Sequence, residues 1–193
     1  MISTLTGVDI LPYLPALAGL RIAVFRDYPY LYDGAMGYEK TYLQTYATAP
    51  DAAIIIARAG GRVVGAATCL PLRAETANIQ HPFRQAGMDI SKIFYFGESV
   101  LEAPYRGQGI GVAFFAARES QARATGHSIT AFCAVQRPAD HPNCPQHYQP
   151  LDEFWIHRGY TRQESLTCQM SWRDIGAAAE SPKTLMFWTR VLP

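Results

Sequence analysis

The spacing of apolar residues along the chain predicts an alternating series of strands and helices. Apolar and β-branched runs bounded by glycine, proline or charged residues predict strands, at residues 2–7, 52–59, 62–70, 93–101, 128–135, 161–172 and 184–191. Apolar residues that recur every three to four positions predict helices, at 9–27, 38–46 and 110–125. A short helix is expected at 151–158, and the polar connection at 71–91 has room for another at 80–85. Pro12 and Pro15 place the firm start of the first helix near Leu14. The pattern predicts a mixed α/β fold.

Local chemistry refines three of these elements. Gly60-Gly61 predicts a hairpin, because glycine supplies the positive φ values of a tight turn. Residues 136–150 contain four prolines and predict an irregular loop. The helix at 110–125 has a predicted buried face of Val112, Phe115, Ala116 and Ala122, a solvent face of Arg118, Glu119, Gln121 and Arg123, and Gly126 as C-cap.

Composition and charge suit one globular domain that spans residues 1–193. The chain is 49% apolar and 17% charged, and its formal net charge of +1 argues against a nucleic-acid or anionic-membrane partner. We find neither an apolar run of about 18 residues nor a cleavable signal pattern, so we predict a cytoplasmic protein. Its four cysteines, which form no CxxC pair, are predicted to be reduced.

Residues 93–125 carry the strongest chemical signal, a strand followed by a glycine-spaced turn and a helix. Gly107, Gly109 and Gly111 let the backbone approach a ligand closely. The first N–H groups of the following helix have no intrahelical partner and, with the helix dipole, suit a phosphate or pyrophosphate. Arg106 adds a positive charge. The turn is therefore a candidate anion site; the alternative is a turn that binds no ligand.

Two familiar nucleotide motifs do not fit this turn. A dinucleotide fingerprint would need glycine where Val112 stands, and no Lys-Ser/Thr follows as a P-loop requires. The remaining pattern, Arg106-x-x-Gly109-x-Gly111, resembles the coenzyme A pyrophosphate loop of the GNAT superfamily of N-acetyltransferases. Two further segments are similar to that family: the lead-in Val100-Leu101-x-x-Pro104-Tyr105, and Phe154-Trp-Ile-His-Arg-Gly-Tyr160 near the last helix.

The resemblance covers nearly all of the chain and implies an acetyl-CoA-dependent enzyme. It implies a mixed, mostly antiparallel sheet that is flanked by helices and splayed at the coenzyme A site. The pyrophosphate would lie over residues 107–111, the pantetheine arm would pair with residues 100–103, and the Leu101 N–H would polarise the thioester carbonyl. The implied cofactor-binding residues are Val100, Leu101, Ala103, Arg106, Gly107, Gln108, Gly109, Ile110 and Gly111.

The implied reaction is direct acetyl transfer to an amine. Because an alkylamine is mostly protonated at pH 7, a base is useful, and Glu98 is the leading candidate. Strand alternation leaves open whether Glu98 faces the site or forms a structural ion pair. Trp155 stands where the family often has a tyrosine that acts as the general acid. Either Tyr148 therefore supplies the proton to the leaving thiolate, or no acid is needed. A non-catalytic coenzyme A-binding module and O-acyl transfer remain alternatives.

The sequence defines the acyl acceptor and the oligomeric state less closely than it defines the coenzyme A site. The resemblance places the aromatic residues Tyr28, Tyr30, Tyr32 and Tyr38 at the acceptor site, although each could instead pack a helix on the sheet. The acceptor is either a small-molecule amine or a protein amine. His141, Cys144 and His147 match no zinc spacing, so no metal is predicted. The apolar last strand could be core or the interface of a homodimer.

Overall fold

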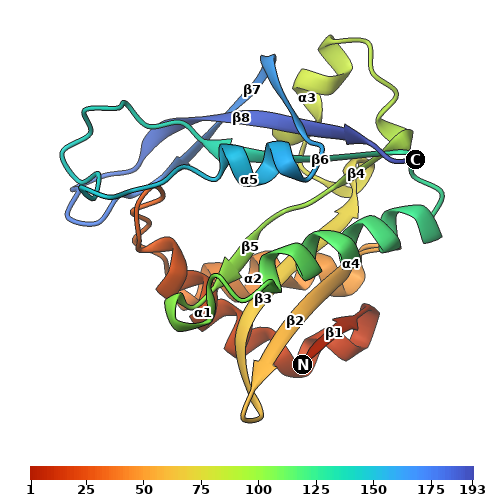
Figure 1. Cartoon of the computed structure of the whole chain (residues 1–193), viewed down its shortest axis with the longest axis horizontal. Helices are drawn as coiled ribbons and strands as arrows, with labels where there is room; N and C mark the ends of the chain where they lie inside the picture. Colours follow the sequence, from red (N-terminus) through yellow and green to blue (C-terminus); the bar gives the residue numbers. More distant parts are fainter.

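The computed structural model describes residues 1–193, and its elements follow the predicted order (Figure 1). The strands are β1 (Ile2–Leu5), β2 (Ala53–Ala59), β3 (Arg62–Pro71), β4 (Ile93–Tyr95), β5 (Ser99–Leu101), β6 (Ile129–Val135), β7 (Thr161–Trp172) and β8 (Ser181–Val191). The α-helices are α1 (Leu14–Phe25), α2 (Met36–Thr48), α3 (Ala77–Gln85), α4 (Ile110–Ala124) and α5 (Asp152–His157). Short 3-10 turns include η1 (Gly7–Tyr13), η2 (Leu72–Ala74), η3 (Ile90–Lys92) and η4 (Ala103–Tyr105).

The eight strands form one mixed sheet in the order β1-β2-β3-β4-β6-β8-β7, and β5 pairs with β3 beside this path. All neighbouring strands are antiparallel except β4 and β6, which are parallel. A core of 25 buried residues lies on the face covered by α1 and α2, and one of 15 lies on the face covered by α4 (Figure 1). The predicted mixed α/β sheet flanked by helices is confirmed.

The predicted continuous strand over residues 93–101 is wrong, because Phe96–Glu98 interrupt it. β4 lies between β3 and β6, whereas β5 pairs only with β3. At the interruption the chain stops pairing with β6. Beyond it, the sheet divides into a half that contains β5 and a half that contains β6, on either side of the middle of the molecule in Figure 1.

The predicted faces of α4 also need correction. Val112 is 40% exposed, whereas Phe114, Arg118 and Glu119 are buried. Glu119 accepts a hydrogen bond from Arg190 Nη1 at 2.8 Å, which compensates for its burial. The Arg118 guanidinium lies 4.3 Å from the centre of the Phe96 ring and donates to the Glu98 carbonyl at 3.3 Å.

The segment Gly7–Phe25 is, by length and composition, apolar enough to cross a membrane, contrary to the sequence-based prediction. In the fold, five of its residues belong to the larger core, namely Ile10, Leu14, Leu17, Ala18 and Leu20. The segment also carries Arg21, which forms ion pairs with two carboxylates. The apolar residues of this segment therefore pack against the sheet.

The last strand is a central strand. β8 lies between β6 and β7, and its apolar residues Leu185, Phe187 and Trp188 are buried. Of the two interpretations of this strand, the structure supports the core.

An arginine with a side chain only 9% exposed connects the loop after α1 to the turn between β7 and β8. Arg137 donates to the carbonyls of Pro29 and Tyr30 at 2.8 Å and to both carboxylate oxygens of Asp174 at 3.0 Å. Arg137 and Lys183 lower the pKa of Asp174, although burial alone would raise it. These contacts hold three segments that are distant in the sequence side by side at the left of Figure 1.

We expect Arg137→Ala to lower the free energy of unfolding by about 3 kcal/mol, because buried acceptors lose their charged donor. Arg173→Ala, which removes the half-exposed pair with Asp33, should cost less than about 1 kcal/mol. Urea unfolding of both variants measures the difference. Equal costs would mean that Arg137 contributes no more than a surface ion pair.

Candidate active site

The edge of β5 that faces β6 lies open between the two halves of the sheet. The Glu98 carbonyl accepts from Thr68 N–H at 3.0 Å, and the Glu102 N–H donates to the Val64 carbonyl at 3.0 Å, so alternate residues of this segment point to β3. Because neighbouring residues in a strand point in opposite directions, Ser99 and Leu101 direct their N–H groups to the opposite edge. The backbone groups of Val100 face β3. The open edge offers backbone partners to an extended ligand.

The glycine turn leads from this edge into α4. Gly107 and Gly109 have φ values of +73° and +79°, in the left-handed region that favours glycine. A Cβ built at either position meets no atom within 4 Å, so the space in front of the turn is free. Gly109 is the N-cap of α4, and its carbonyl accepts the Ala113 N–H at 3.1 Å. The N–H groups before Ala113 belong to the first turn and have no helical partner.

Two polar side chains shape the rim of this turn. Arg106 Nε donates to the Leu101 carbonyl at 3.1 Å, and its Nη2 lies 3.5 Å from Asp27 Oδ2. Gln108 Nε2 donates to the Pro104 carbonyl at 2.9 Å. Arg106 is half-exposed, so its positive charge lies at the surface between β5 and α4. Ala103 is exposed in η4, and Ile110 and Gly111 form the first turn of α4.

Glu98 lies in the strand interruption and faces the helices α1 and α2. Its side chain is buried, with Oε2 accepting from the Tyr42 hydroxyl at 3.0 Å and lying 2.7 Å from Arg21 Nη1. Oε1 is buried and has no hydrogen-bond partner. A buried polar atom without a partner is rare in folded proteins, and a catalytic role is one explanation for it. The interruption places a buried carboxylate with an unpartnered oxygen directly before β5.

Gly97 makes room for this arrangement. A Cβ at this position would collide with the hydroxyls of Tyr46 and Thr68. Thr68 Oγ1 accepts the Glu98 N–H at 3.1 Å, and the Tyr46 hydroxyl lies 2.9 Å from that of Tyr42. Burial and the Glu98 charge raise the pKa of Tyr42 well above its ordinary value, so its hydroxyl stays a proton donor to Glu98.

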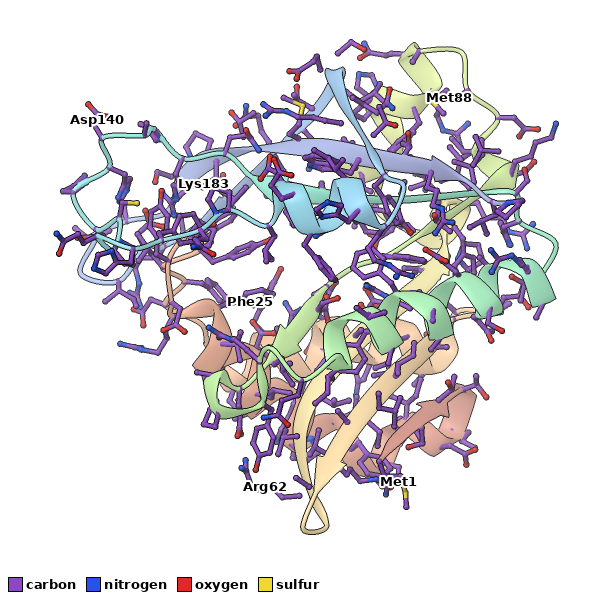
Figure 2. All side chains as sticks on the ribbon, viewed as in Figure 1. Met1, Phe25, Arg62, Met88, Asp140 and Lys183 are labelled. Atoms are coloured by element: carbon purple, nitrogen blue, oxygen red, sulfur yellow. The ribbon has the colours of Figure 1, made fainter.

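Two of the predicted acceptor-site tyrosines meet the loop of residues 136–150. The ring of Tyr28 lies 4.6 Å from that of Tyr148 in an edge-to-face contact. Burial, followed by the Cys133 thiol and the Glu98 carboxylate, raises the pKa of Tyr30. The Tyr30 carbonyl accepts from Arg137 Nη2 of the loop at 2.8 Å. In Figure 2, Phe25, whose ring is 4.6 Å from that of Tyr30, lies between the two halves of the sheet.

The other two tyrosines differ in exposure. Burial and the neighbouring Glu39 carboxylate raise the pKa of Tyr32, which is half-buried. Tyr38 is 62% exposed on α2. The structure packs Tyr28 on Tyr148, packs Tyr30 on Phe25 and Trp172, and leaves Tyr38 at the surface.

Trp155 occupies a packed position on α5. Its ring lies 5.0 Å from that of Phe132 and 5.1 Å from that of Trp188. No group of three or more His, Cys, Asp or Glu side chains is arranged to hold a metal ion. In the loop, His141 Nδ1 accepts the Asn143 N–H at 3.1 Å.

Comparison with known proteins supports the same class of protein as this geometry. The chain matches the acetyltransferase (GNAT) family over residues 19–149 and therefore belongs to that family, as its glycine turn predicts. No curated protein matches it significantly.

Solved structures share the fold over the whole chain at low sequence identity. A ribosomal-protein-alanine N-acetyltransferase from Brucella melitensis has a TM-score of 0.63 at 16% identity, with 100% of this chain and 99% of that chain covered. An aminoglycoside 6'-N-acetyltransferase complexed with coenzyme A has a TM-score of 0.63 at 13% identity, covering 100% and 98%. The yncA protein of Salmonella typhimurium, solved with acetyl-CoA, has a TM-score of 0.61 at 11% identity, covering 100% and 95%.

Sequence reasoning missed four polar residues around Glu98: Arg21, Glu39, Tyr42 and Arg118. Arg21 lies on an apolar stretch of helix and Glu39 lies next to Lys40 in a helix of mixed character, and nothing in their local pattern indicates that they meet. Arg118 was assigned to the solvent face because charged residues are rarely buried. A signal for Tyr42 exists in the spacing of Tyr38, Tyr42 and Tyr46, which recur every four residues along one helix.

Proposed function

We propose that this protein transfers the acetyl group of acetyl-CoA to an amine, by direct attack of the amine on the thioester. The single observation that carries the proposal is the position of Glu98, a buried carboxylate with an unpartnered Oε1 that directly precedes β5, the strand whose second edge is unpaired. Membership of an acetyltransferase family supplies the reaction class. The acceptor is a small-molecule or protein amine.

The residues between β5 and α4 fit acetyl-CoA. The open space in front of Gly107 and Gly109 and the free N–H groups of the first turn of α4 suit its pyrophosphate. Arg106 adds charge at the rim. The outward N–H of Leu101 is a donor for the thioester carbonyl, and such a backbone donor contributes about 3 kcal/mol when aimed at a developing oxyanion. When bound, acetyl-CoA supplies the activated acetyl group.

Glu98 is the proposed base. Both of its partners, Arg21 and Tyr42, contact Oε2, so Oε1 is the oxygen that takes a proton from the attacking amine. The proton moves from the amine nitrogen to Glu98 as the new nitrogen–carbon bond forms, and the thiol departs from the same carbon. Tyr28, Tyr30 and Tyr32 are the proposed acceptor wall, because aromatic faces suit an amine with cationic or aromatic character.

Tyr148 is the proposed proton donor to the departing thiolate. Burial, followed by Asp152 and Cys144, raises its pKa, so the phenol is protonated at neutral pH. We expect Tyr148→Phe to lower kcat about 100-fold and to leave the affinity for acetyl-CoA unchanged. Tyr13→Phe, which removes a phenol hydroxyl that accepts from Arg58 at 3.1 Å, is the matched control and should keep most of kcat. Equal activity of wild type and Tyr148→Phe would mean that the thiolate leaves unaided.

A cytoplasmic location fits the four free cysteines, because thiols stay reduced in that compartment. It is part of this proposal rather than a separate observation. The proposed reaction would then draw on the acetyl-CoA of the cytoplasm.

Turnover tests the proposed function against a non-catalytic coenzyme A-binding module. Thiol release from acetyl-CoA is followed with a panel of amines, including tyramine, spermidine and a lysine-containing peptide, and mass spectrometry identifies the acylated product. The proposal predicts amine-dependent thiol release. Tight binding of acetyl-CoA without release, across amines and hydroxyl-bearing analogues, would instead support a binding module; release with hydroxyl acceptors alone would support O-acyl transfer.

A further inference from the structure

Two buried carboxylates, one of them the proposed base Glu98, share the guanidinium of Arg21. Arg21 of α1 donates from Nε to Glu39 Oε2, and its Nη1 lies 2.7 Å from Glu98 Oε2. Glu39 is fully buried and Glu98 is 8% exposed. Each carboxylate keeps one buried oxygen without a partner. The three residues, which we call the Arg21 cluster, carry two negative charges and one positive charge.

The guanidinium of Arg21 packs against two aromatic rings in addition to its two carboxylate partners. Its central carbon lies 4.4 Å from the centre of the Tyr42 ring and 5.1 Å from that of Phe25. Although burial alone would lower it, the charges of Glu98 and Glu39 raise the pKa of Arg21, so the guanidinium stays charged. A planar guanidinium that uses two of its nitrogens for two carboxylates fixes the direction of both.

We propose that Arg21 is a positioning residue for the reaction, and that Glu39 holds it in place. Arg21 occupies Oε2 of Glu98 and thereby turns Oε1 toward the acceptor. Glu39 accepts the hydrogen bond from Nε of Arg21, which leaves Nη1 as the nitrogen that contacts Glu98. This inference rests on the proposed role of Glu98 and extends it to α1 and α2, which carry Arg21 and Glu39.

Helix packing alone does not explain the cluster. Arg21 and Glu39 would form a neutral, buried pair between α1 and α2 without any third member. Glu98 adds a buried negative charge, which costs stability unless it is compensated. The backbone of Glu98 is also fixed independently, by Thr68 and by Arg118 Nη1 at its carbonyl. Thus the bond from Arg21 orients the carboxylate rather than the chain.

Several titratable or charged groups face Glu98, and all of them bear on its response to pH. They are Arg21 from α1, Glu39, Tyr42 and Tyr46 from α2, Glu75 after η2, Arg118 from α4, and Tyr30 from the loop after α1.

The test measures the Glu98 carboxyl directly and needs no acceptor. Protein labelled with 13C at the glutamate carboxyl is titrated by NMR, and the Glu98 signal is assigned by its loss in Glu98→Gln. Arg21→Gln removes the positive partner and should move the titration of this signal to higher pH, because the charged form loses its compensation. Glu39→Gln removes the competing negative charge and should move it to lower pH. Arg21→Lys should restore part of the wild-type behaviour.

Opposite shifts in the two variants show that Arg21 and Glu39 act on the Glu98 carboxylate, and a fall in kcat at an unchanged KM then identifies a positioning role, since a purely structural role would leave kcat unchanged. The same titration midpoint in wild type, Arg21→Gln and Glu39→Gln would overturn the inference. If Arg21→Gln does not fold, Arg21→Lys and Glu39→Gln carry the comparison. With an amine that turns over, Arg21→Gln should lower kcat about tenfold or more at an unchanged KM for acetyl-CoA.

The two proposals fail in different ways. Full activity of Glu98→Gln would remove Glu98 as the base, whatever the titration shows. An inactive Glu98→Gln combined with unshifted titrations in the Arg21 and Glu39 variants would remove only the positioning role.

Discussion

Replacing Glu98 by glutamine should lower kcat/KM for amine acetylation about 1,000-fold while the protein stays folded. The amide keeps the shape of the carboxylate but cannot take a proton from the amine, and loss of a general base costs about 10²–10⁴ in rate. The charge change is tolerable, because Arg21 keeps Glu39 as a partner. Stopped-flow or spectrophotometric thiol release measures the effect. The affinity for acetyl-CoA should not change.

Glu102→Gln is the matched control for this substitution. Glu102 lies just after β5 and forms an exposed ion pair with Arg62, so its loss removes a carboxylate near the same strand without touching the Arg21 cluster. We expect its activity to stay within about twofold of wild type, as for a surface ion pair. If Glu98→Gln retains as much activity as Glu102→Gln, Glu98 is a structural carboxylate.

Gly109→Val should raise the dissociation constant for coenzyme A about 10- to 100-fold. The added side chain enters the space in front of the turn and displaces a phosphate from charge-assisted hydrogen bonds, each of about 1.5–3 kcal/mol. The substitution also strains the backbone, since Gly109 has a φ of +79°. Valine in this region costs about 2 kcal/mol of stability. Isothermal titration calorimetry with coenzyme A measures the loss.

Gly126→Val separates the two effects. Gly126 follows the other end of α4, has the same φ of +79°, and likewise has no atom within 4 Å of an added Cβ. It should therefore be strained to the same extent, about 22 Å from the glycine turn, and bind coenzyme A normally. Equal affinity of the two folded variants would remove the anion site from the turn.

The sequence predicted most elements because their local patterns are strong. The helix α4 was predicted at 110–125 and lies at Ile110–Ala124, and the hairpin of β2 and β3 follows from Gly60-Gly61. The turn before α4 was recognisable because glycines at fixed spacing serve one backbone conformation. In contrast, the interruption at Phe96–Glu98 is not visible in the apolar run that contains it. It arises where the chain leaves β6 at the end of β4 and where the hydroxyls of Tyr46 and Thr68 fill the space beside Gly97.

The surroundings of Glu98 could not be predicted for a related reason. Arg21 is 77 positions from Glu98 and 18 from Glu39, so their meeting depends on how α1 and α2 cross the sheet. Helical periodicity also misassigned Arg118 and Glu119, because it assumes that charges face solvent, whereas these side chains are buried with partners from β8 and the strand interruption. Glu98 itself was named from its place in the sequence, and the direction of its side chain came only from the fold.

The central claim is that the gap beside β5 binds acetyl-CoA, and a thermal-shift comparison of acetyl-CoA, coenzyme A, NADH and ATP tests it most directly. A ligand at about 100 times its dissociation constant adds about 2.7 kcal/mol of stability, which raises the melting temperature by a few degrees. We predict such a shift with acetyl-CoA and coenzyme A and none with NADH or ATP. No shift with either coenzyme A form, or a shift with NADH or ATP alone, would contradict the account.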